Sequence, residues 1–149
     1  MEAGLEEIFR RAVTKEEEAY HLYSWAQGET DDPATKTLLR ELATEEQKHV
    51  TILENLRRRG VKGYDPPKLA SPYISEYLNS PSTWQGANLQ EIAVMAIKRE
   101  EAAQNFYQLF AQATSDPEAR RVLEVLAAAE LSHKRRLEKY YEDVFLREG

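Results

Sequence analysis

The chain has 149 residues, a length typical of one domain that can bury a sizeable core. Hydrophobic residues make up 42% of the sequence and charged residues 31%, with 6 Gly and 6 Pro, which is typical of a helix-rich globular protein. The formal net charge of −6 argues against a nucleic-acid partner, because phosphate binding requires a concentrated excess of Lys and Arg.

Several further classes are excluded by what the sequence lacks. There is no cysteine, so disulfides, thiolate catalysis and cysteine-ligated metal centres cannot arise within this chain. The start, Met1–Glu7, is acidic and lacks the apolar core of a signal peptide. No apolar run approaches the ~20 residues of a membrane span. We therefore expect a cytoplasmic protein without a membrane partner.

Residues 1–60 predict a helical hairpin. Apolar residues recur at helical spacing from Leu5 to about Gln27, and Gly28 marks the expected end of that helix. Asp32 followed by Pro33 has the pattern of an N-cap and a first helical residue. A second helix is expected from there to about Arg59, with Gly60 at its C-terminal end.

Residues 61–87 have a different composition, rich in Pro, Gly and Ser, and predict a long linker. A short helix is expected within 71–79, after Pro72. We expect the linker's aromatic side chains to pack against the helices or a partner subunit rather than bind a ligand. These residues are Tyr64, Tyr73, Tyr77 and Trp84.

Residues 88–149 predict a second helical hairpin. Asn88 and Glu91 have capping-box spacing at the start of a third helix, and Asp116-Pro117 repeats the cap pattern at the start of a fourth. Two hairpins with tight turns, joined by one long connection, suit a four-helix bundle with one crossover. The predicted fold class is therefore all-α, with a single domain over 1–149.

The two hairpins are copies of one another. Sliding the chain along itself by 84 residues brings matching residues into register without a gap, which indicates an internal duplication. The matched pairs include Glu16 and Glu100, Tyr23 and Tyr107, Asp32 and Asp116, Glu46 and Glu130, and His49 and His133.

Each half carries one Glu-x-x-His motif, whose two side chains project from the same face of a helix. One such motif is weak evidence, because Glu and His are common on helices. Here both copies lie on the apolar stripe, as do Glu16 and Glu100 on the other helix of each hairpin. The neighbouring Glu17 and Glu101 are expected to face solvent, and His21 lies off the stripe and is expected at the surface.

Four buried carboxylates would be very costly without cations, since each buried ion loses several kcal/mol of hydration. Two divalent ions balance four glutamates if the imidazoles are neutral. Carboxylate and imidazole ligands without sulfur suit iron or manganese, and this set of helices and ligands is typical of di-iron and di-manganese bundles. The predicted metal ligands are Glu16, Glu46, His49, Glu100, Glu130 and His133.

On these motifs the sequence resembles the ferritin-like di-iron carboxylate superfamily, and within it the rubrerythrin-type four-helix domain. The resemblance covers Leu5 to about Arg59 and Asn88 to about Tyr140. It implies two iron ions, with manganese or zinc as alternatives. The implied roles are terminal carboxylates for Glu16 and Glu100, bridging carboxylates for Glu46 and Glu130, and single-metal ligands for His49 and His133. Tyr23 and Tyr107 resemble hydroxyl donors that orient the carboxylates, although plain core packing is an equal alternative.

Two features depart from typical rubrerythrins. They usually append a cysteine-ligated rubredoxin-like iron centre, and this chain has no cysteine. They also place a further glutamate one turn after the third-helix ligand, where this chain has Ala103. Turnover would therefore require an outside electron donor protein.

The resemblance implies an oxidoreductase of oxidative-stress protection, in which ferrous iron reacts with oxygen or hydrogen peroxide. We expect a homodimer, because duplicated hairpins with a long linker look more rubrerythrin-like than cage-forming. Two alternatives stay open. One is ferritin-like iron binding or storage by ferrous oxidation, and the other is a binding module whose metal site is structural.

Overall fold

The computed structural model describes residues 3–65, 68, 70–81 and 83–147, and the regular elements in this part of the chain are helices. Residues 66, 67, 69 and 82 of the predicted linker lie outside the described part. The chain divides into two compact units, Met1–Gly63 and Tyr64–Gly149, and each contains one helical hairpin. In the part that the structure describes, no helix combines enough length with enough apolar character to cross a membrane. The predicted all-α class is confirmed.

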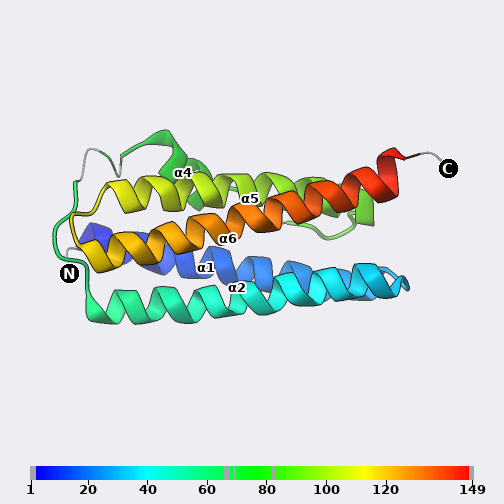
Figure 1. Ribbon diagram of the computed structural model, residues 1–149, viewed down its shortest axis with the longest axis horizontal. Coiled ribbons are helices and arrows are strands. Elements are labelled where there is room, and N and C mark those ends of the chain that lie inside the picture. Colours follow the sequence, from blue (N-terminus) through cyan, green and yellow to red (C-terminus); the bar gives the residue numbers. More distant parts are fainter. Residues whose placement is uncertain (1–2, 66–67, 69, 82, 148–149) are drawn as a thin grey trace. The chain divides into compact units, whose positions relative to one another are not determined.

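The first unit consists of α1 (Ala3–Ala26), the short 3-10 helix η1 (Gln27–Glu29) and α2 (Pro33–Arg59). Figure 1 shows α1 and α2 as an antiparallel pair. The predicted N-cap is confirmed, since the Asp32 carboxylate accepts hydrogen bonds from the Thr35 backbone N–H (3.0 Å) and hydroxyl (2.7 Å). The bond from the Thr35 hydroxyl, and then that from its backbone N–H, lower the pKa of Asp32.

The second unit contains α5 (Leu89–Gln112), α6 (Pro117–Tyr141) and a terminal π-helical turn, η2 (Glu142–Leu146). The predicted capping box is present, because Asn88 accepts from the Glu91 backbone N–H while the Glu91 carboxylate accepts from the Asn88 backbone N–H. Asp116 caps α6 by accepting from two backbone N–H groups. Both predicted starting points are confirmed.

The linker contributes helix α4 (Pro72–Leu78), capped by Ser71, to the second unit. Figure 1 shows α4 beside α5. The buried Tyr77 ring packs on Phe106 and Tyr107 of α5, with centroid separations of 4.9 and 6.3 Å. Packing against the helices is thus confirmed for Tyr77, whereas Tyr73 is 50% exposed. The linker helix α4 therefore belongs to the same unit as the second hairpin, whereas linker residues 61–63 belong to the first unit.

The two glycines that flank α2 differ in backbone conformation. Gly60 ends the helix with φ 86° and ψ 158°, a region that only glycine adopts without strain. Gly28 lies in η1 and is not among the positive-φ glycines. An added Cβ would meet nothing within 4 Å at either position, so backbone conformation alone separates the two sites.

Substituting each glycine by alanine tests this difference. We expect Gly60→Ala to lower the free energy of unfolding by about 1–3 kcal/mol, because the side chain strains the backbone. Gly28→Ala should leave it unchanged or raise it by about 0.4–1 kcal/mol, because alanine restricts the unfolded chain. Urea denaturation measures both changes. Equal stability of the two variants would contradict the assignment of Gly60 as the obligatory stop of α2.

Candidate metal centre

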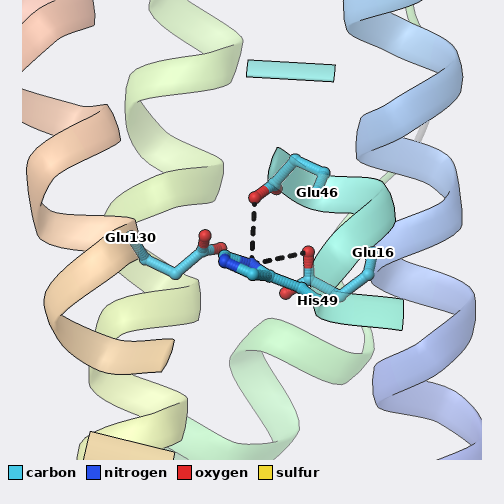
Figure 2. Close-up of side chains that lie close together, drawn as sticks. All are labelled: Glu16, Glu46, His49 and Glu130. Carbon is cyan, nitrogen blue, oxygen red and sulfur yellow. Dashed lines mark ion pairs between the residues drawn. The ribbon is translucent and has the colours of Figure 1, made fainter. Parts of the chain in front are cut away.

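The first unit brings together Glu16 of α1 and the Glu46–His49 pair of α2. Both carboxylates are fully buried, and the His49 side chain is 7% exposed. His49 Nδ1 lies 3.2 Å from Glu46 Oε1 and 3.6 Å from Glu16 Oε2. Figure 2 shows both carboxylates directed toward the His49 ring. Three of the six predicted ligands therefore form one cluster within this hairpin.

The helix register explains this burial. Glu46 and His49 are three positions apart, so they share a face of α2 with the buried Leu42 and Leu53. Glu16 holds a similar position among the buried apolar residues of α1. The adjacent Glu17 is exposed, as predicted. A polar cluster therefore replaces one layer of the apolar face between the two helices.

The second unit repeats the arrangement with Glu100 of α5 and the Glu130–His133 pair of α6. All three side chains are fully buried. His133 Nδ1 lies 3.4 Å from Glu130 Oε1 and 3.6 Å from Glu100 Oε1. The remaining three predicted ligands thus form a second cluster with nearly the same separations.

The donor chemistry of each cluster fits a divalent metal ion. Within each trio, every residue offers a ligand atom within 4.8 Å of the others. Two donors bound to one ion at about 2.1 Å lie about 3.0–3.4 Å apart at ordinary coordination angles, close to the observed nitrogen–oxygen separations. Two carboxylates also balance one divalent charge when the imidazole is neutral. We call each trio a half-site.

The predicted tyrosines are both buried. Tyr23 of α1 and Tyr107 of α5 have no exposed surface. The Tyr107 ring packs edge-on against Phe106, at a centroid separation of 5.0 Å, so a packing role is visible for this residue. A role for either hydroxyl in orienting a carboxylate stays a prediction.

The third histidine is separate from these clusters. His21 is exposed and contacts the Tyr20 ring edge-on at 5.3 Å. Its predicted surface position is confirmed. The exposed Glu101, next to Glu100, likewise confirms the predicted solvent-facing position.

Sequence reasoning missed Arg99, which contacts the second half-site directly. Its Nη1 donates to Glu100 Oε1 (2.9 Å) and Glu130 Oε2 (3.0 Å), and its Nη2 donates to the Tyr77 hydroxyl (3.1 Å). The duplication carried a signal for this residue, because the 84-residue offset pairs Arg99 with Lys15, another cation that directly precedes a predicted ligand. Tyr77 was predicted only to pack, and its hydrogen bond to Arg99 was not predicted.

Comparison with known proteins places this geometry in a family. A family model described as Rubrerythrin matches residues 7–146, which include both half-sites and the linker. Neither a search of curated proteins nor a search of solved structures gave a match. The predicted ferritin-like class is confirmed by this match together with the all-helical architecture. The chain therefore belongs to the rubrerythrin family.

Proposed function

We propose that the two half-sites together bind a dinuclear non-haem iron centre that reacts with oxygen or hydrogen peroxide. The family and the buried carboxylate–imidazole clusters fit a di-iron protein. The observation that carries the proposal is the burial of two glutamates around one imidazole in each hairpin, with the separations of a coordination shell. The duplication supports joining the half-sites, because two equal trios supply the ligand set of a di-iron bundle.

Each protein ligand then has a distinct role. Glu16 and Glu100 would act as terminal carboxylates, His49 and His133 would each bind one metal, and Glu46 and Glu130 would be the bridging carboxylates. Four carboxylates and two divalent ions give a neutral set, which offsets the cost of burying the charges. Tyr23 and Tyr107 would orient the carboxylates through their hydroxyl groups.

Bound iron would supply two electrons per dinuclear centre, enough to reduce one hydrogen peroxide to two water molecules with two protons. The protein's own contribution is to hold the carboxylates in place and exclude bulk water. The chain has no cysteine, so the electrons would return from an outside donor protein. A cytoplasmic homodimer that protects against oxidative stress remains our prediction for the whole protein.

Metal analysis tests the ligand assignment. Protein purified under iron-replete conditions should contain two metal ions per chain. Glu46→Ala and Glu130→Ala should each lower this content sharply, because each variant removes a bridging carboxylate. Elemental mass spectrometry measures the stoichiometry.

The exposed neighbours of the terminal ligands provide matched controls. Glu17→Ala and Glu101→Ala each remove one glutamate charge from the same two hairpins, on α1 and α5, without touching a half-site. The metal content should therefore stay at two per chain. Retention of two metals in both Glu46→Ala and Glu130→Ala would contradict the bridging assignment.

Stopped-flow spectroscopy tests the reaction. Mixing the ferrous protein with hydrogen peroxide should oxidise the iron faster than peroxide oxidises the same concentration of free ferrous iron. Glu130→Ala should lose this acceleration, because it lacks a complete ligand set. Oxidation no faster than with free iron would refute the redox proposal.

Gel filtration distinguishes the proposed peroxide or oxygen reaction from the alternative function, iron storage. A cage-sized particle would favour iron storage.

Metal binding should also stabilise the fold. A free ferrous or manganous ion at 100 times its dissociation constant should raise the free energy of unfolding by about 2.7 kcal/mol, because only the folded chain presents the buried ligands together. Urea denaturation with and without a chelator measures the difference. Glu46→Ala should show a much smaller response. An unchanged unfolding midpoint on metal removal would mean that the buried carboxylates are balanced in some other way.

A further inference from the structure

Arg99 places a permanent positive charge inside the second half-site. It lies on α5 directly before Glu100, and its side chain is only 13% exposed. One guanidinium nitrogen, Nη1, donates to carboxylate oxygens of both Glu100 and Glu130, at 2.9 and 3.0 Å. Arginine is not deprotonated in proteins, so this charge is present at every working pH.

Arg99 Nη1 contacts carboxylate oxygens that a bound cation would also use. The oxygen of Glu100 that accepts from Arg99 is Oε1, which is also the oxygen 3.6 Å from His133 Nδ1. Glu130 instead divides its oxygens, with Oε1 toward His133 and Oε2 toward Arg99. A metal ion bound by Glu100 and His133 would therefore compete with the guanidinium for Glu100 Oε1.

The linker helix holds the other side of the guanidinium. Nη2 donates to the hydroxyl of the buried Tyr77 on α4 at 3.1 Å, and the guanidinium carbon lies 5.8 Å from the centre of the Tyr77 ring. Arg99 also lines a cavity of about 710 Å³ between α4 and α5, whose other lining residues include Ser75, Asn79, Met95 and Lys98. Arg99 thus has a hydrogen-bond partner away from the carboxylates, the Tyr77 hydroxyl, and a cavity into which its guanidinium can move.

The duplication shows that a basic residue recurs at this position. Lys15 precedes Glu16 as Arg99 precedes Glu100, and Lys15 is only 7% exposed. Its ammonium nitrogen lies 3.9 Å from Glu18. Burying a Lys or Arg is unusual unless the charge is paired. A largely buried cation directly before the first glutamate of the half-site is therefore a feature that both halves of the duplication share.

We propose that Arg99 is the internal counter-ion of the Glu100–Glu130–His133 half-site and competes with metal for it. In the metal-free protein the guanidinium holds the two carboxylates together. When metal binds, the guanidinium releases Glu100 Oε1 and shifts toward the α4–α5 cavity while Tyr77 retains its other edge. Arg99 therefore lowers the metal affinity of this half-site. This inference rests on the metal-binding function proposed above.

Calorimetric titration with cobalt(II) tests the competition. Arg99→Gln removes the charge but keeps a hydrogen-bond donor. We expect one cobalt site to bind about 10- to 100-fold tighter, a gain equal in size to the loss that follows when a group that orients metal ligands is removed. Arg99→Lys keeps the charge and should bind like the unchanged protein. Lys98→Gln is the matched control, because Lys98 is the exposed cation next to Arg99 in the same cavity.

Two additional measurements separate a counter-ion from a merely structural residue. Metal-free Arg99→Gln should melt at a lower temperature than the unchanged metal-free protein, and the difference should shrink when cobalt is bound. Tyr77→Phe removes only the hydroxyl that holds Nη2 once metal has displaced Nη1, so it should weaken cobalt binding, in the direction opposite to Arg99→Gln. This variant keeps the test informative if Arg99→Gln does not fold.

The outcomes distinguish this inference from the proposed function. Weaker cobalt binding by Arg99→Gln would mean that Arg99 orients the ligands for metal, which overturns the competition. Equal binding by the unchanged protein and Arg99→Gln also overturns it, while metal binding stands. Absence of cobalt binding by the unchanged protein would overturn the metal-binding function itself.

Discussion

The cost of burying carboxylates is the constraint on which the rest of the structure depends. Each hairpin places two glutamates on its apolar face, where an ion loses several kcal/mol of hydration. Positive charge placed close to such residues offsets that cost. In the second hairpin, part of that positive charge comes from Arg99. In both hairpins the carboxylate–imidazole separations are close to those of ligands that share one metal ion. The helices of each hairpin fix the positions of these charged side chains relative to one another.

The helix caps set this register. Glu46 and Glu130 each lie 14 residues after the aspartate that caps their helix, Asp32 and Asp116. Because a cap fixes where a helix begins, and each residue adds a constant rotation, equal spacing presents the two Glu-x-x-His motifs on equivalent faces. The nearly equal Nδ1–oxygen separations in the two half-sites follow from this repetition. Local capping chemistry thus places residues that lie four turns away.

Much of this was predictable from the sequence, because the signals were local. The starts of α2, α5 and α6 follow from capping patterns, and the end of α2 follows from Gly60. The burial of the six predicted ligands follows from polar residues on apolar stripes. Arg99 was not predicted, since a basic residue beside a glutamate usually belongs to a solvated helix face. Its burial depends on Tyr77, which approaches α5 from a linker helix far away in the sequence. Such a contact leaves no periodic pattern to detect.

The charge balance at the second half-site is also affected by Ala103, which stands where typical rubrerythrins have a glutamate. Typical rubrerythrins resemble this chain but carry a further glutamate where the fully buried Ala103 stands. This chain therefore has one negative charge fewer at α5, and Arg99 adds a positive charge beside Glu100 and Glu130. Oxidation of a metal centre adds positive charge, so a more positive surrounding favours the reduced state. With iron bound, these two residues would make the ferric centre easier to reduce, which would suit the outside electron donor that we propose.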